Sequence, residues 1–317
     1  MGLFSNNKKL CPICGNPTPR LFSTKIEDMP ICKECDSHID LPSGAVNEMS
    51  VDDFKGYLNF FKENQALRDA FTETYSYDLG FLNGNFVVDA NSRLFRLHNS
   101  GFGIAFEAAN LKSFRILEDG KPLFKNNGNA LKCYISEVPE RINAMSPLIA
   151  QFRMQRHEYE MWERMERMQR ERARDDDNHN PPPIHRARPY FETEGPIERF
   201  QIELELEHPY WSDYRWERKA PTFSTSDPSI EGYMQEYEES VNTLHELATQ
   251  LMQLICPGAG EVYDNAGMAG QPVSQTAPQA NSEANVIEQL QQYKALLDSG
   301  ILTEEEFAAK KRQLLGL

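Results

Sequence analysis

The chain has 317 residues, of which 40% are hydrophobic and 26% charged, a composition ordinary enough to build hydrophobic cores. Its formal net charge of −15 argues against a nucleic-acid or anionic-membrane binder that uses the whole chain, because phosphate contacts need clustered Lys and Arg. The longest apolar runs, such as residues 102–106, are far shorter than the roughly 20 residues of a membrane-spanning helix. Without an apolar signal-peptide core near residue 1, we expect a cytoplasmic protein whose thiols stay reduced.

Four of the six cysteines form two C-x2-C pairs, Cys11 with Cys14 and Cys32 with Cys35, with 17 residues between the pairs. This spacing is typical of a zinc ribbon, because two thiolates on one tight turn can reach the same ion and four complete a tetrahedron at about 2.3 Å. Gly15 permits the tight turn after the first pair. We therefore expect residues 1–42 to form a zinc ribbon with a structural Zn2+ ion. Its ligands would be Cys11, Cys14, Cys32 and Cys35.

Other interpretations of these cysteines remain open. The four could be unrelated thiols or a redox pair, although two pairs at this separation favour a metal. His38 lies three residues after Cys35 and could replace one ligand. Cys133 and Cys256 stand alone in the sequence, and we expect both to be small core residues.

Residues 43–74 are expected to be a helical connector. Ser50 and Asp53 have the spacing of a capping box at the start of a helix. Apolar residues then fall mostly on one helical face, at Phe54, Tyr57, Leu58, Phe61, Leu67 and Phe71.

Residues 75–255 are expected to form a β-rich body. Short aromatic or β-branched segments are separated by turns such as Asp119-Gly120. Residues 198–208 alternate apolar and acidic side chains, which predicts a strand with one buried face. Apolar residues recur every three or four positions over residues 229–255 and predict an amphipathic helix. The other expected strands are Asn85–Ala90, Arg93–Asn99, Gly103–Glu107, Ser113–Leu117 and Leu131–Glu137.

A charged insert at about 140–190 interrupts this body. Its residues 150–175 predict a helix supported by Glu-to-Arg pairs at i,i+4, such as Glu166 with Arg170. Its exposed face is either a self-associating coiled-coil surface or the face of a solvated single helix. The seam that would pair consists of Met154, Met161, Met165 and Met168.

Residues 256–284 are rich in Gly, Ala, Pro, Ser and Gln, which predicts a flexible linker. Residues 285–317 then predict two short helices, with Gly300 as the stop of the first and a capping box of Thr303 and Glu306 at the start of the second. The apolar positions of this hairpin are Ile287, Leu290, Leu296, Leu297, Phe307, Leu314 and Leu315.

This stretch, from Ile287-Glu288-Gln289-Leu290 to Leu314-Leu315, closely resembles the SHOCT module, a short C-terminal domain of bacterial proteins. The resemblance implies oligomerisation or docking of a partner. The cysteine-rich segment, with Cys11-Pro12-Ile13-Cys14-Gly15 and Cys32-Lys33-Glu34-Cys35, is similar to a bacterial zinc-binding family of unknown function. The middle of the chain more weakly resembles a bacterial PH-like domain, from which the charged insert departs. That resemblance implies an α+β fold in which a bent antiparallel sheet is closed by one C-terminal helix.

The sequence contains no recognisable catalytic motif, and we expect no enzyme. His245-Glu246 opens like a metalloprotease motif, but Thr249 stands where the second histidine is needed. The first hypothesis is therefore a non-enzymatic zinc-binding adaptor or scaffold that acts by protein–protein interaction or oligomerisation. The alternative is a nucleic-acid-binding protein that uses the ribbon, although residues 1–40 carry five bases and five acids and residues 190–240 have a net charge of −9.

Overall fold

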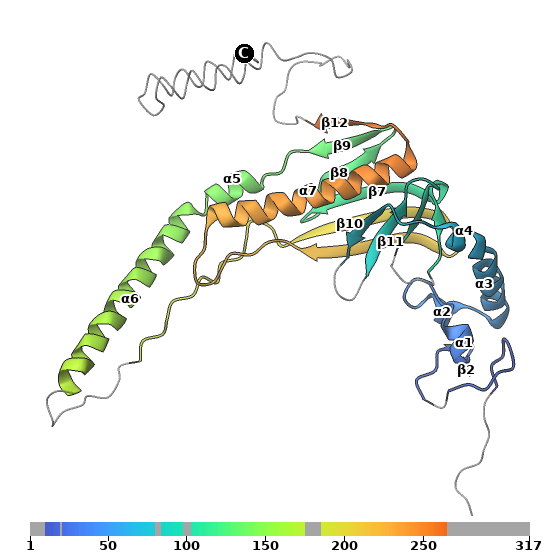
Figure 1. Cartoon of the computed structure of the whole chain (residues 1–317), viewed down its shortest axis with the longest axis horizontal. Coiled ribbons are helices and arrows are strands. Elements are labelled where there is room, and N and C mark those ends of the chain that lie inside the picture. Colours follow the sequence, from blue (N-terminus) through green and yellow to red (C-terminus); the bar gives the residue numbers. More distant parts are fainter. Residues whose placement is uncertain (1–9, 20, 80–83, 98–102, 175–184, 265–317) are drawn as a thin grey trace, which may run out of the picture. The chain divides into compact units, whose positions relative to one another are not determined.

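The computed structural model describes residues 10–19, 21–79, 84–97, 103–174 and 185–264. The chain divides into one unit of residues 1–265 and a second of residues 266–317, and every described residue belongs to the first unit. This unit mixes antiparallel sheets with long helices, which confirms the predicted α+β class (Figure 1). Among the helices of the described ranges, none carries an apolar stretch that would reach across a bilayer.

The cysteine-rich segment is built from a small hairpin and one helical turn. Strands β1 (Lys25–Ile26) and β2 (Met29–Pro30) pair antiparallel. The two residues between them have positive φ angles of 47° and 62°. Helix α1 (Lys33–Asp36) follows. The side chains of Ile26 and Ile31 are the buried aliphatic residues of this segment.

The expected helical connector consists of α2 (Ala45–Glu48), α3 (Val51–Glu63) and α4 (Gln65–Ala70). The predicted capping box is confirmed, because the Ser50 hydroxyl accepts the N–H of Asp53 while the Asp53 carboxylate accepts the N–H of Ser50. The buried face of α3 carries Phe54, Tyr57 and Phe61, as its apolar spacing predicts.

A four-stranded antiparallel sheet follows the helices. Its core is a stack of aromatic rings, with centroid distances of 5.8 Å between Phe86 and Phe95 and 5.1 Å between Phe95 and Phe106. The strands lie in chain order: β3 (Tyr75–Asp78), β4 (Asn85–Asp89), β5 (Leu94–Arg96) and β6 (Phe106–Glu107).

The second sheet has six strands in the order β11-β10-β7-β8-β9-β12. Its neighbouring strands are antiparallel except β12, which pairs parallel to β9 at one edge. In β10, the apolar side of the predicted alternation is buried and the acidic side faces outward. The strands are β7 (Leu111–Glu118), β8 (Lys121–Asn127), β9 (Ala130–Tyr134), β10 (Arg199–His208), β11 (Trp211–Lys219) and β12 (Gly260–Asp264).

Helix α7 (Ile230–Ile255) packs across β7, β8 and β9 of this sheet (Figure 1). Its N-cap is Ser229, whose hydroxyl accepts the N–H of Gly232. Buried residues such as Tyr237, Leu244 and Leu251 recur on one face, which confirms the predicted amphipathic helix. A buried carboxylate joins the helix to the sheet, because Glu118 accepts hydrogen bonds from the hydroxyls of Tyr237 (2.7 Å) and Ser136 (2.8 Å).

The charged insert leaves the sheet after β9 as α5 (Val138–Asn143) and α6 (Ser146–Arg174). Ile149 and Phe152 anchor the first turns of α6 in the core. Further along α6, Glu166 pairs with Arg170 at 2.5 Å, as the charge pattern predicts. The methionine seam defined above is exposed, with between 42% and 69% of each side chain open to solvent.

Several strands differ from the sequence-based expectation. Strands β3, β8 and β11 of the body were not expected, and the segment predicted at Gly103–Glu107 contains only the two-residue β6. The flexible linker expected over 256–284 is wrong in its first part, because Gly260–Asp264 form β12. This strand is held mainly by backbone pairing with β9, since most of its side chains are exposed, and so it has no apolar alternation to reveal it. The remainder of the expected linker and the expected hairpin at 285–317 lie outside the described residues.

Candidate metal centre

The first cysteine pair lies on a tight turn. The N–H of Gly15 donates to the carbonyl oxygen of Cys11 at 2.9 Å, and the N–H of Cys11 donates to that of Asn16 at 2.8 Å. Gly15 has a φ of +77°, a left-handed conformation that glycine adopts without a steric penalty. The turn therefore brings the side chains of Cys11 and Cys14 to the same side, as the sequence predicts.

The second pair is positioned by helix α1. Cys32 is the N-cap residue, and its sulfur accepts the N–H of Cys35 at 3.5 Å. One helical turn thus orders both sulfurs of this pair.

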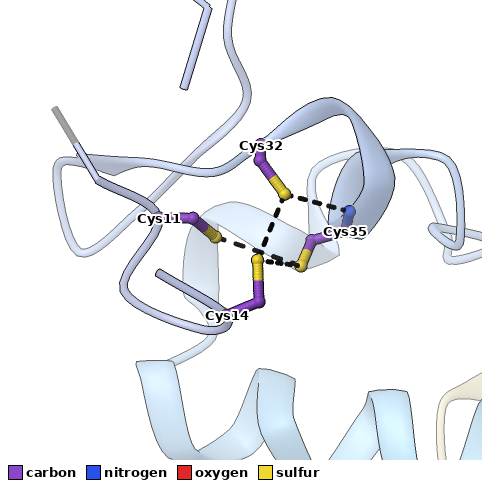
Figure 2. Close-up of side chains that lie close together, drawn as sticks. All are labelled: Cys11, Cys14, Cys32 and Cys35. Atoms are coloured by element: carbon purple, nitrogen blue, oxygen red, sulfur yellow. Dashed lines mark hydrogen bonds between the residues drawn. The ribbon is translucent and has the colours of Figure 1, made fainter. Parts of the chain in front are cut away.

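The two turns face each other, and the four sulfur atoms converge (Figure 2). The measured distances are 3.4 Å between the sulfurs of Cys14 and Cys32, 3.7 Å between Cys14 and Cys35, and 3.9 Å between Cys11 and Cys35. A tetrahedron of thiolates at about 2.3 Å from a zinc ion has sulfur–sulfur distances of about 3.8 Å. A disulfide needs about 2.05 Å, so the cysteines are not paired as disulfides, and their spacing fits a shared ion.

Most of the cluster is buried. Cys11, Cys32 and Cys35 are buried, and Cys14 is exposed at the rim. Burial opposes ionisation of Cys11, but backbone hydrogen bonds from Cys14, Cys32 and Ile13 outweigh burial and lower the pKa of its thiol to about 7. Burial, together with the neighbouring sulfur atoms, raises the pKa of Cys35. A metal ion would overcome this cost, because it binds thiolates and displaces their protons.

The four sulfurs could hold a metal ion, and the chemistry of such a site is structural. Four protein ligands fill a tetrahedral coordination sphere and leave no position for a reacting water. His38 does not join the cluster, since its ring packs on Phe61 with 5.1 Å between centroids. The structure therefore groups the four predicted cysteines and leaves His38 outside.

Hydrogen bonds tie the segment after the cluster to the rest of the unit. The Tyr57 hydroxyl, from α3, donates to the carbonyl oxygen of His38 at 2.7 Å and accepts the N–H of Asp40 at 2.8 Å. The Asp40 carboxylate accepts the N–H of Ile104 at 2.6 Å, and its carbonyl oxygen accepts the indole N–H of Trp211 at 3.2 Å. The cluster is thus attached to both α3 and the six-stranded sheet.

Of the two remaining cysteines, Cys133 is the core residue that the sequence predicts, whereas Cys256 packs at the edge of the core. Cys133 is buried in β9, and Cys256 is half-buried at the C-cap of α7. Burial and the nearby charge of Glu261 raise the pKa of the Cys133 thiol to about 11. His245 and Glu261 lie beside Cys133, a grouping that sequence spacing did not reveal because Cys133 is far from the other two residues along the chain.

Comparison with known families finds one match, at residues 288–315, to SHOCT, described as a short C-terminal domain. The chain therefore carries a C-terminal SHOCT domain, and the resemblance noted in the sequence is confirmed over those residues. They lie outside the described residues. Comparison with curated proteins and with solved structures found no match to the chain.

Proposed function

We propose that this chain is a non-enzymatic, zinc-containing adaptor that self-associates through its SHOCT domain and binds protein partners. The observation that carries the proposal is a SHOCT domain at residues 288–315 on the same chain as a closed four-cysteine cluster. In this proposal the SHOCT domain serves assembly and the cysteine cluster stabilises the fold, and neither role requires catalysis.

The proposed metal is Zn2+, held in a zinc ribbon. Four cysteine sulfurs at the spacing of a thiolate tetrahedron form a donor set that this ion prefers. A segment of this size buries few apolar side chains, so the ion would supply its folding free energy, about 10–16 kcal/mol in comparable peptides. Reduced thiols are needed for this role, which supports a cytoplasmic location.

The SHOCT domain is the proposed assembly element. A matched segment of 28 residues is too short to bury its own apolar side chains in a stable core. Packing against copies of itself would cover them, and a chain that bears several binding surfaces gains avidity when copies assemble.

The proposed partner-binding part is the middle of the chain, which we interpret as PH-like. Antiparallel strands β7 to β11 are followed by one long amphipathic helix, α7, that packs across the sheet. This order of elements supports the interpretation that the sequence resemblance implies.

The charge distribution disfavours the nucleic-acid alternative. Residues 1–42 carry five bases and five acids, a net charge of zero, and residues 190–240 have a net charge of −9. A phosphate-binding surface needs an excess of bases at the contact. A gel shift at low salt would test this alternative, which requires binding that weakens as salt is added.

The adaptor proposal is tested by the mass of the full-length protein in solution. We expect light scattering after size exclusion to report more than one chain per particle, with the mass rising with concentration. Leu290→Asp or Phe307→Asp should return the protein to a single chain, since a charge on an apolar position opposes packing.

The control is Gln292→Asp, which adds the same charge at a polar position and should leave the mass unchanged. The proposal is rejected if the unsubstituted protein is a single chain at every concentration, or if the apolar and polar substitutions have the same effect.

A further inference from the structure

We propose that Cys133, His245 and Glu261 form a second zinc site, separate from the four-cysteine cluster. One sulfur, one imidazole nitrogen and one carboxylate oxygen, supplied by these residues, lie within 4.8 Å of one another. Neither the proposed adaptor function nor the first cluster depends on this site.

Three elements bring the side chains together: β9, α7 and β12. In the parallel pairing of β9 with β12, Glu261 lies opposite Leu131 and Tyr263 lies opposite Cys133. Because Leu131 and Cys133 are the buried residues of β9, Glu261 is on the side of the sheet that α7 covers. Helix α7 supplies His245, whose ring makes an edge-type contact with that of Phe124 in β8, with 5.2 Å between centroids.

The imidazole nitrogen Nε2 of His245 is a buried polar atom that makes no hydrogen bond within the described residues. It lies 3.0 Å from Oε1 of Glu261, but the contact lacks the angles of a hydrogen bond. The atom is shielded from solvent and has no other partner in the part of the chain that the structure describes. A buried polar atom without a hydrogen bond is destabilising, and an ion bound by both Nε2 and Oε1 would remove that cost.

Hydrogen bonding around the three residues orients the carboxylate for this role. The Tyr263 hydroxyl donates to Oε2 of Glu261 at 2.9 Å, which leaves Oε1 directed toward the histidine. Polar partners of this kind commonly hold metal ligands in place. An ion pair of 2.6 Å between Lys132 and Asp264 fixes β12 against β9 beside the site.

The donor set selects a divalent transition ion. A thiolate and a carboxylate would balance two positive charges, and sulfur, nitrogen and oxygen together suit Zn2+. The ion would have access from outside, because the side chains of His245 and Glu261 are 33% and 34% exposed. Three protein ligands leave a fourth position for water, so this ion should be held less tightly than one held by four cysteines.

The site would also have a structural effect on β12. Most side chains of this edge strand are exposed, including Tyr263 at 61%, so little apolar burial holds it. An ion shared by Cys133, His245 and Glu261 would cross-link the strand to both β9 and α7.

The test measures zinc bound per chain in the full-length protein by elemental analysis, followed by competition with a chelator. We expect two equivalents, one of which is released more readily. Glu261→Gln and His245→Gln should weaken the second equivalent by at least about tenfold, and Cys133→Ser should do the same. In the cobalt-loaded protein, Cys133→Ser should also remove part of the sulfur-to-metal absorption.

Matched substitutions outside the group are Cys256→Ser and Glu246→Gln, and both should keep two equivalents. Cys14→Ser should affect only the tighter equivalent, which separates a failure of the first site from a failure of the second. The proposal is overturned if the protein binds a single equivalent that Cys14→Ser weakens, or if Glu261→Gln and His245→Gln leave zinc binding unchanged. Glu261→Gln is decisive if Cys133→Ser does not fold, because Glu261 is on an exposed edge strand.

Discussion

His208, at the end of β10, is a histidine held in its neutral form by aromatic neighbours. Its ring lies 5.0 Å from that of Phe60 and 4.9 Å from that of Phe106, measured between centroids. Its Nδ1 accepts the N–H of Tyr210 at 3.2 Å. Burial among these groups lowers the pKa of His208 from its ordinary value of 6.5 to about 4.

This shift predicts a loss of stability in acid. Between pH 6.5 and about 4 the unfolded chain binds a proton at His208 that the folded protein does not, so the free energy of unfolding falls as the pH falls. This fall can be at most about 1.4 kcal/mol per pH unit, and partial exposure of the His208 ring makes it smaller. The substitution His208→Asn can keep an acceptor for the N–H of Tyr210. Between pH 7 and pH 5, we expect the free energy of unfolding of this variant, measured with urea, to fall by about 1 kcal/mol less than that of the unsubstituted protein.

A matched variant is His157→Asn, at an exposed position of α6, which should retain the full acid sensitivity. Equal pH dependence of the His208 variant and the unsubstituted protein would contradict the assignment. Acid release of a bound metal would affect all three proteins alike, so the comparison isolates the histidine.

Single residues also show what the sequence could predict about the sites. Cys11 and Cys14 were predictable as ligands because a pair on one turn, repeated once, needs only local geometry to converge. His245 and Glu261 were not, because packing of α7 and pairing of β12 bring them to Cys133. His38 was left open by its spacing, and packing against a ring from α3 places it outside the cluster.

At the scale of elements, predictability follows the pattern of burial. Strand β10 was predictable because its apolar and acidic residues alternate strictly. The turn at Asp119-Gly120 was also predictable, yet the strand after it, β8, was not, since Lys121-Pro122 and Asn126-Asn127 dilute its apolar centre. Strand β11 has a polar outer face with few apolar residues, so its pairing with β10 determines it more than its own sequence does.

The hairpin of the cysteine-rich segment carries a backbone conformation that its residues do not favour. Glu27 and Asp28 both have positive φ angles, the conformation of a type I′ turn, which prefers Asn-Gly. The β7–β8 turn has the same pair of positive angles, but there glycine occupies its second position. The cost at Glu27 and Asp28 must be met by the fold around them.

Replacing Glu27-Asp28 by Asn-Gly should therefore stabilise the segment by about 1 kcal/mol. Because binding of a structural metal is coupled to folding, the gain should appear as roughly fivefold tighter zinc binding in chelator competition. Asp28→Val should act in the opposite direction, since a β-branched residue is strained at positive φ. Zinc affinities that do not separate these two variants would show that the turn adopts another conformation.

At the scale of the whole described unit, the cysteine cluster and the six-stranded sheet differ in what holds them together. The sheet buries a continuous apolar face beneath α7. The cluster segment has a short hairpin, one helical turn and few buried side chains apart from its cysteines, Ile26 and Ile31. The two parts meet through Tyr57, Asp40 and Trp211.

This difference predicts a graded response to loss of the first metal ion. In hydrogen exchange of the full-length protein, Cys14→Ser should remove protection from residues 10–42, because the ion is the main source of their stability. Protection of α3 should weaken, since Tyr57 loses its ordered partners at His38 and Asp40. Strands β7 and β10 should keep their protection, because their core does not include the cluster.

Cys256→Ser, which removes a cysteine outside both groups of ligands, should reproduce the unsubstituted protein. The substitution is preferable to a chelator, because a chelator would also remove an ion from Cys133, His245 and Glu261 and loosen β12. If protection fell equally in β7, β10 and residues 10–42, the bonds through Tyr57 and Asp40 would couple the unit into one cooperative structure. If residues 10–42 kept their protection, their fold would not depend on a metal ion at all.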